Sequence, residues 1–205
     1  MKSVTIPHHK LGEALERGAW FDGSSIEGFT RIFESDMFLK PDASTFAILP
    51  WKSCNNHKAA RIICGVCMPN GKPFEGDPRA ILRNAAAKAA EEGFTYYTGP
   101  ELEFFLFRPD ENGKIAAAPH DVGSYFDFGQ RDMASDVRRD IIFSLEKLGL
   151  EIEASHHEVA FGQQEIDFKY SDALKSADSV ITFKYTAKAI AQGHGLYASF
   201  MPKPI

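Results

Sequence analysis

The chain has 205 residues, 44% of them hydrophobic, and a formal net charge of −5. Such a chain can bury one large core or two small ones. An acidic composition without a run of lysine or arginine does not suit a nucleic-acid groove, and no stretch reaches the roughly 18 apolar residues of a membrane span. The N-terminus, MKSVTIPHHK, has no apolar signal core, so we expect a cytoplasmic protein.

The first third of the sequence is rich in strand and turn residues. A short helical turn is expected around 11–17, a glycine-serine loop over 21–29, extended segments over 30–39, 45–51 and 60–68, and a turn over 69–73. Turn residues such as glycine, proline and asparagine bound the extended segments. We therefore predict a small β-rich domain over residues 1–76.

The periodicity of the sequence changes after Gly76. Asp77 and Pro78 are typical of a helix N-cap and first turn, and Asp172 is a second cap of this kind. Helices are predicted over 79–92, 133–148 and 173–192, and strands over 99–107, 151–155, 164–170 and 197–201. This α+β pattern predicts a second domain over 77–205, and its last strand lacks a closing helix, so we expect an interrupted domain.

Two glutamates lie within an apolar segment, GPELEFFLF (99–107). Residues i and i+2 of a strand share a face about 7 Å apart, so Glu101 and Glu103 should point the same way. Buried like charges repel, and a shared proton, a basic partner or a hard cation such as Mg²⁺ or Mn²⁺ would relieve the repulsion. The alternative is an edge strand whose glutamates face water.

A second acidic cluster occurs in EASHHEVAFGQQEIDFKY (153–170). Glu158 closes one predicted strand and Glu165 begins the next, so a tight connection would place both near one end of a sheet. With Glu101 and Glu103 they would offer four carboxylates, which suits a divalent cation that also holds phosphates. The adjacent His156 and His157 should face opposite ways, so that at most one serves this site.

The cysteines suggest a different metal. Cys54, His57, Cys64 and Cys67 have the spacing C-x2-H and C-x2-C of zinc ligands. However, RIICGVCM is typical of a strand, on which residues three apart face opposite sides. The alternative is three ordinary thiols.

Several long motifs occur together in one order: FDGSSIEGF, ESDM, PFEGDPR, GPELEFFLF, RRDI, EASHHEVAFGQQEIDFKY and FMPKPI. They resemble glutamine synthetases of the bacterial and archaeal type I. The resemblance implies a partial β-grasp domain, without its first strand, followed by a truncated catalytic α/β barrel domain. It also implies ATP-dependent ligation of ammonia to L-glutamate through γ-glutamyl phosphate, with Mg²⁺ or Mn²⁺.

The resemblance implies roles for individual residues. The metal-ligand positions are Glu101, Glu103, Glu158 and Glu165. Glu153 matches a nucleotide-contacting glutamate, and Tyr170 an aromatic residue near the adenine. Asp22 and Ser25 match a loop that enters the neighbouring subunit's site, where the aspartate binds ammonium and takes its proton, and Tyr125 matches a tyrosine of that pocket. Arg31 matches an arginine linked to glutamine feedback.

The resemblance also implies the partners ATP, L-glutamate and ammonium, and a homo-oligomer that is a dodecamer in the full-length family. Family chains continue past FMPKP with further site residues, so we expect this chain to be inactive alone. Two alternatives remain: a related γ-glutamyl-amine ligase, and a non-catalytic assembly or regulatory fragment.

Overall fold

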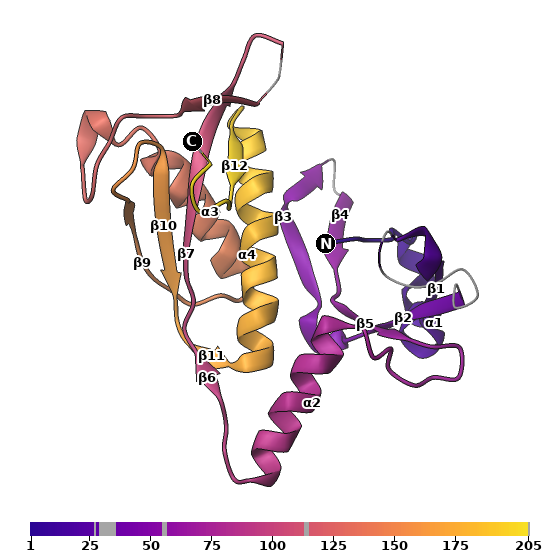
Figure 1. Cartoon of the computed structure of the whole chain (residues 1–205). Helices are drawn as coiled ribbons and strands as arrows, with labels where there is room; N and C mark the ends of the chain where they lie inside the picture. Colours follow the sequence, from indigo (N-terminus) through magenta and orange to yellow (C-terminus); the bar gives the residue numbers. More distant parts are fainter. Residues whose placement is uncertain (27, 29–35, 55–56, 113–114, 205) are drawn as a thin grey trace. The chain divides into compact units, whose positions relative to one another are not determined.

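The computed structural model describes residues 1–26, 28, 36–54, 57–112 and 115–204, apart from the side chains of 53, 54 and 115–117 (Figure 1). The contacts divide the chain into two compact units, 1–47 with 60–96 and 48–59 with 97–205. Helices and antiparallel sheets occur in separate segments, which confirms the α+β prediction. Within the described ranges, no helix has both the length and the apolar character needed to span a bilayer.

The first unit contains a three-stranded antiparallel sheet. Its order is β1 (Ala19–Asp22), β2 (Asp36–Pro41), β5 (Cys64–Cys67), and α1 (Leu11–Arg17) contacts β2. Gly18 joins α1 to β1 at φ +76°, where a Cβ would lie 2.6 Å from the ring of Phe38 and 2.7 Å from the carbonyl oxygen of Leu39. Glycine is therefore required at this turn.

Helix α2 (Pro78–Glu91) begins where the sequence predicts it. One carboxylate oxygen of Asp77 accepts the N–H of Arg79 at 3.1 Å, and the other accepts the N–H of Val66 at 3.1 Å. The N-cap thus also ties the helix to β5. Gly93, at φ +83°, follows the helix end.

The segment 60–68, predicted as one strand, is in fact divided between two sheets. Strands β3 (Ala47–Cys54) and β4 (His57–Arg61) form a hairpin, and β5 starts only at Cys64. The carbonyl of Ile63 accepts the N–H of Asp42 at 2.9 Å between them. Most of the hairpin belongs to the second unit, where the rings of Trp51 and Tyr185 meet edge to face at 5.3 Å.

The second unit is built on an antiparallel sheet in the order β12 (Tyr197–Ser199), β7 (Glu101–Pro109), β10 (Gln163–Phe168), β9 (Ile152–His157), with β8 (Ile115–Pro119) pairing with the far end of β7. Strand β7 is therefore internal, and the interpretation of 99–107 as an edge strand is wrong.

A two-stranded sheet joins β6 (Tyr97–Thr98) to β11 (Ser171–Asp172). The short 3-10 helices are η1 (His8–Lys10), η2 (Gly23–Ser25), η4 (Ala43–Thr45) and η5 (Gly129–Arg131).

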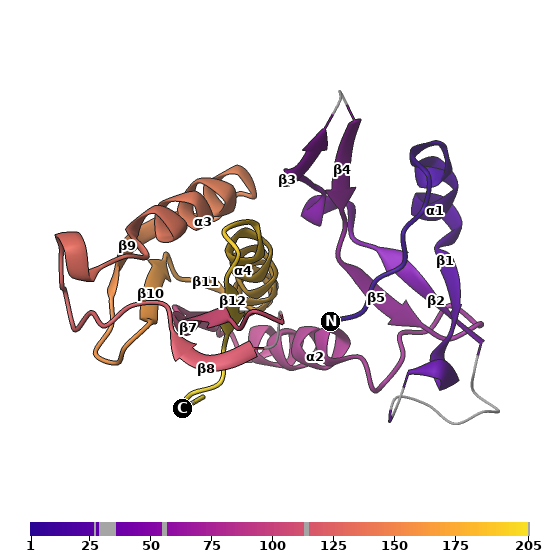
Figure 2. The same cartoon turned by 90° about the horizontal axis from the view of Figure 1, so that it is seen from above.

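Helices α3 (Ser135–Lys147) and α4 (Ala173–Gly193) lie side by side on one face of this sheet (Figures 1 and 2). Asp172 caps α4 by accepting the N–H of Lys175 at 3.1 Å, as the sequence predicts. Phe104 of β7 and Phe183 of α4 are both fully buried, with ring centroids 6.0 Å apart. Burial of large side chains at this centre contributes about 1.5–3 kcal/mol each.

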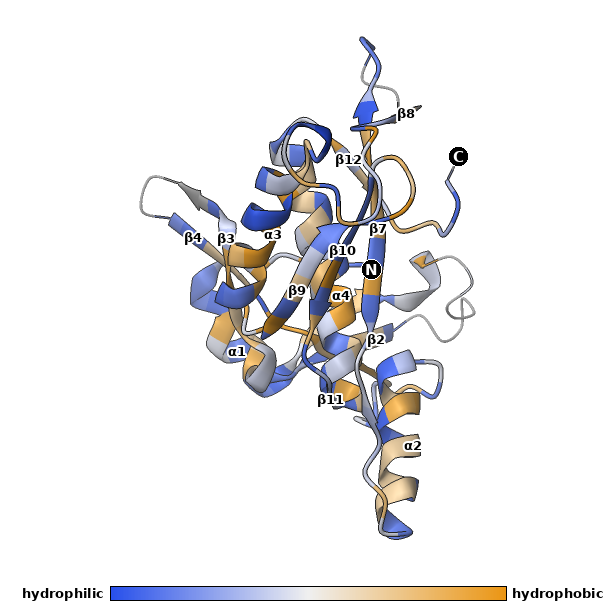
Figure 3. Ribbon diagram, turned by 90° about the vertical axis from the view of Figure 1, so that its left-hand side faces the viewer, coloured by the Kyte–Doolittle hydropathy of each residue, from blue (hydrophilic) through white to orange (hydrophobic). Residues whose placement is uncertain are grey.

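Polar groups connect α3 to the sheet beneath it. The buried guanidinium of Arg138 donates to both carboxylate oxygens of Asp132, at 2.8 and 2.5 Å, and to the side-chain oxygen of Gln164 on β10. Figure 3 shows that β7, β9 and β10 each carry hydrophobic and hydrophilic segments. Leu102, Phe104, Leu106, Ile166 and Phe168 belong to the core beneath the helices. Phe105 and Phe107 alternate with them and share the opposite face of β7 with Glu101 and Glu103.

Candidate functional site

The pairing of β7 with β10 places four acidic residues opposite one another. Glu103 is in register with Glu165, and Glu101 with Asp167. Leu102 and Ile166, which alternate with them, are buried in the core. Glu101 and Glu103 therefore share the face away from the helices, as predicted, and that face carries four carboxyl groups.

Three of the predicted glutamates converge on this face. Carboxylate oxygens of Glu103, Glu158 and Glu165 all lie within 4.8 Å of one another; we call these three residues the glutamate cluster. Glu158 follows the last residue of β9, and its carboxylate accepts the N–H of Val159 at 2.8 Å. Gln163 donates to Glu103 at 2.5 Å. A second group of potential metal ligands consists of His156, Glu165 and Asp167. Glu101 is exposed and belongs to neither group among the described residues.

Glu165 is the most strongly perturbed member of the cluster. Burial, followed by the charge of Asp167 and by the hydrogen bond and charge of Glu158, raises its pKa to about 8. Without a cation, this carboxyl therefore keeps its proton at neutral pH.

The two adjacent histidines face opposite sides of β9, as predicted. Nε2 of His156 lies 3.5 Å from Glu165 and its Nδ1 3.6 Å from Glu158. His157 is fully buried instead. Its Nε2 lies 2.8 Å from a carboxylate oxygen of Asp121 and its Nδ1 2.6 Å from the carbonyl oxygen of Glu158. His156 thus borders the cluster, and His157 anchors the chain that carries Glu158.

Gly123, in the segment before α3, lies so close to His157 that a side chain at this position would clash with the imidazole. A Cβ at Gly123 would lie 2.5 Å from its Nε2. The N–H of Gly162 donates to the same Asp121 oxygen at 3.0 Å, and Gly162 has φ +69°. Asp121 thus holds His157 before Glu158 and Gly162 after it, which fixes the connection between β9 and β10 at both ends.

Tyr125 lies next to this site in the second unit. Its ring stacks on Phe126 at 4.2 Å and meets the ring of His156 edge to face at 5.3 Å. The side chain is 52% exposed, so its hydroxyl can reach a ligand beside the cluster.

The predicted nucleotide residues lie at the opposite end of β9 and β10. Glu153 on β9 has no paired residue on β10, because the register shifts between Asp167 and Phe168. The hydrogen bond and charge of Glu151 raise the pKa of Lys169, and the charge of Glu153 adds a smaller contribution. Tyr170 is exposed and meets Tyr97 edge to face at 5.9 Å.

Asp22 and Ser25 belong to the first unit. Asp22 accepts hydrogen bonds from the hydroxyls of Ser24 at 2.6 Å and Ser25 at 2.8 Å, and from the N–H of Ser24 at 2.9 Å. These bonds lower the pKa of Asp22, so it stays ionised. Arg31 lies outside the described residues.

The sequence reasoning missed Asp167 and Gln163. Both alternate with Glu165 on β10, so the i, i+2 rule applied to Glu101 and Glu103 would have found them. Oδ1 of Asp167 is buried and, within the described part of the chain, accepts no hydrogen bond from an N–H or hydroxyl group. Besides burial, the charge of Asp167 and a hydrogen bond between the two carboxyl groups help to raise the pKa of Glu165. A divalent cation would replace the proton that these acids share, and the oxygen donor set suits Mg²⁺ or Mn²⁺.

The proposed zinc ligands have no comparable arrangement in the ranges described. The groups of potential metal ligands found there include neither Cys64 nor Cys67, which are free thiols three residues apart on β5. His57 lies on β4, and the side chain of Cys54 lies outside the described residues.

Comparison with known proteins agrees with these features. The family model "Glutamine synthetase, beta-Grasp domain" matches residues 1–69, and "Glutamine synthetase, catalytic domain" matches residues 75–205. The glutamine synthetases of Methanosarcina mazei and Halobacterium salinarum are 56% and 53% identical over the whole chain. The chain covers 46% and 45% of these relatives, so it spans about half their length.

Solved structures give the same result. A structure described as a GmaS/ADP complex is 31% identical, with a TM-score of 0.87, and is matched over 100% of this chain and 46% of its own. The Plasmodium falciparum glutamine synthetase is 27% identical, with a TM-score of 0.81, over 98% of this chain and 43% of its own. The chain belongs to the glutamine synthetase family.

Proposed function

We propose that this chain supplies part of the active site of a glutamine synthetase, which joins ammonia to L-glutamate at the expense of ATP through γ-glutamyl phosphate. The observation that carries the proposal is the glutamate cluster on the open face of β7 and β10. The family models support a β-grasp domain over about 1–76 and a catalytic domain from about 77 onward. The proposed partners are ATP, L-glutamate, ammonium and further copies of the chain.

Glu103, Glu158 and Glu165 would hold Mg²⁺ or Mn²⁺, with Glu101 and Asp167 beside them. Such a cation neutralises phosphate oxygens and the transferred phosphoryl group when bound. Glu165 must release its proton before it can act as a ligand. His156 lies between Glu158 and Glu165, and His157 and Asp121 keep the Glu158 turn in place.

The remaining residues would bind the substrates. Tyr170 would offer its exposed ring to the adenine, and Glu153 lies at the same end of the sheet. Asp22, kept ionised by Ser24 and Ser25, would enter the site of a neighbouring subunit, attract ammonium there and take its proton. Tyr125 would line the ammonium pocket of its own subunit, which receives this loop from another copy.

An assay of ligase activity tests the proposal. The chain is joined to the remaining C-terminal part of the Methanosarcina mazei glutamine synthetase, and ATP- and glutamate-dependent incorporation of ammonia is measured. We expect activity that Glu165→Gln removes and that Glu146→Gln, an exposed position on α3, leaves unchanged. A folded chimaera without activity, or an active Glu165→Gln variant, would refute the proposal. Larger amines in place of ammonia would identify a γ-glutamyl-amine ligase.

A further inference from the structure

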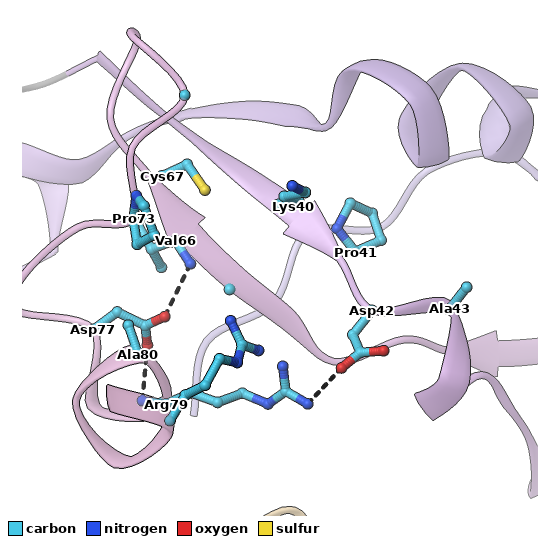
Figure 4. Close-up of a pocket in the computed structure, with 13 residues that line it drawn as sticks. Lys40, Pro41, Asp42, Ala43, Val66, Cys67, Pro73, Asp77, Arg79 and Ala80 are labelled. Atoms are coloured by element: carbon cyan, nitrogen blue, oxygen red, sulfur yellow. Dashed lines mark hydrogen bonds and ion pairs between the residues drawn. The ribbon is translucent and has the colours of Figure 1, made fainter. Parts of the chain in front are cut away.

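A pocket of about 320 Å³ lies within the first unit, between β2, β5 and α2 (Figure 4). It contains no residue of the glutamate cluster. The charged and thiol side chains that line it are Lys40, Asp42, Cys67, Asp77, Arg79 and Arg83.

Both acids of the pocket are engaged in its framework. Asp77 accepts the N–H groups of Val66 and Arg79, so each of its oxygens caps the backbone. Asp42 forms an ion pair with Arg79 at 2.7 Å and accepts the hydroxyl of Ser44 at 2.6 Å. Figure 4 shows the contacts of Asp77 with Val66 and Arg79 and the ion pair between Arg79 and Asp42. The acids therefore hold the walls together.

Two further cations reach the pocket from different elements. Lys40 lies on β2, and Arg83 lies one helical turn after Arg79 on α2. Both are exposed, and within the described part of the chain neither forms an ion pair. Burial raises the pKa of the Cys67 thiol, and the charge of Asp77 raises it further, whereas the charges of Lys40 and Arg83 lower it. Lys40 and Arg83 both line the pocket, so the two cations face one cavity from β2 and from α2.

We propose that this pocket binds a small anion carrying phosphate or carboxylate groups, held between Lys40 and Arg83. With Arg79 paired to Asp42, these two side chains supply the unneutralised donors, and a guanidinium and an ammonium are the groups that bind such oxyanions. The volume is at the lower end for small-molecule sites, about 300–1,000 Å³, so the ligand is a small metabolite. This site is independent of the ligase activity proposed above.

Calorimetric titration tests the proposal. Sodium phosphate and sodium succinate are titrated separately into the chain at constant ionic strength. We expect saturable binding of at least one probe, weakened about tenfold or more by Lys40→Gln or Arg83→Gln, which corresponds to about 1.4 kcal/mol. Lys88→Gln removes the same charge from α2 outside the pocket and should leave binding unchanged. Saturation by phosphate assigns a phosphate-bearing ligand, and saturation by succinate alone assigns a carboxylate.

The outcomes against the proposal are equally clear. Absence of saturation by both probes, or equal weakening by Lys88→Gln, would overturn it. A second measurement localises the binding: in a Cys54→Ser, Cys64→Ser background, a saturating probe should slow the alkylation of Cys67 by iodoacetamide several-fold. A probe that binds without changing this rate binds elsewhere and would also refute the proposal.

Discussion

Glu103 and Glu165 lie directly opposite each other on antiparallel strands, with the carboxylate of Glu158 beside both. Like charges directly opposite one another destabilise a sheet. The protein relieves this repulsion by keeping Glu165 protonated, and a bound cation would relieve it by neutralising the charges. Cation binding, proton release and stability are therefore coupled at one position.

The first prediction concerns metal affinity. Replacing Glu165 by Gln should weaken Mn²⁺ binding by tenfold or more. Even the loss of a group that only hydrogen-bonds to a metal ligand lowers metal affinity about 10–100-fold. Titration of the chain with Mn²⁺, followed by electron paramagnetic resonance, measures this. Glu146→Gln is the matched control, and an unchanged affinity in Glu165→Gln would disprove the assignment.

The second prediction concerns pH. The pKa of Glu165 is about 8 in the folded chain and near the ordinary glutamate value of 4.5 when the chain is unfolded. Between these values the folded state binds more protons, so the free energy of unfolding falls as the pH rises, and the decline ends above about 8. Urea unfolding of the metal-free chain at pH 5, 6.5 and 8 measures this free energy. It should fall more steeply with pH for the wild type than for Glu165→Gln, and an equal fall in both proteins would contradict the prediction.

The same raised pKa predicts proton release on metal binding. Because the cation needs ionised carboxylates, Mg²⁺ or Mn²⁺ affinity should increase as the pH rises from 6 to 8. Titrations in two buffers of different ionisation enthalpy would measure the released protons. Identical heats in both buffers would mean that Glu165 is already ionised.

The fourth prediction concerns Arg138, and its sequence neighbour Arg139 provides the control. Arg138→Ala would leave Asp132 buried without its partner, so we expect a loss of about 3–5 kcal/mol in the free energy of unfolding. The side chain of Arg139 is 56% exposed and pairs with Asp136 at 2.8 Å. Arg139→Ala should therefore cost below about 0.5 kcal/mol. Equal effects in chemical denaturation would refute the distinction.

The core of the second unit gives a comparable pair. Phe183 is fully buried against Phe104 and Phe168, so Phe183→Ala should cost about 3–5 kcal/mol. Ile181 on the same helix is 45% exposed, and Ile181→Ala should cost below about 1 kcal/mol. Thermal unfolding of both variants measures the difference, and a mild effect at Phe183 would place the core elsewhere.

Local rules predicted those parts of the structure that neighbouring residues determine. The caps at Asp77 and Asp172 and the common face of Glu101 and Glu103 follow from side-chain chemistry and strand geometry over a few residues. The opposite orientations of His156 and His157 follow in the same way.

Long-range pairing could not be predicted in this way. Whether 99–107 is internal or at an edge depends on β10 and β12, which lie more than 50 residues away in sequence. The register that sets Asp167 opposite Glu101 has the same origin. The pairing of His157 with Asp121 likewise joins residues 36 positions apart, and no short motif specifies it.

The alternation on β9 makes this strand intolerant of changes in length. Deleting one residue before His156 would exchange the positions of the two imidazoles. The ring now bordering the glutamates would point toward Asp121, and the fully enclosed ring would emerge among the carboxylates. Each face would still carry one histidine, but Glu158 would take the place of His157 and its carboxylate would lie beside Asp121. Homologous chains should therefore vary in length outside this strand and keep its residue count.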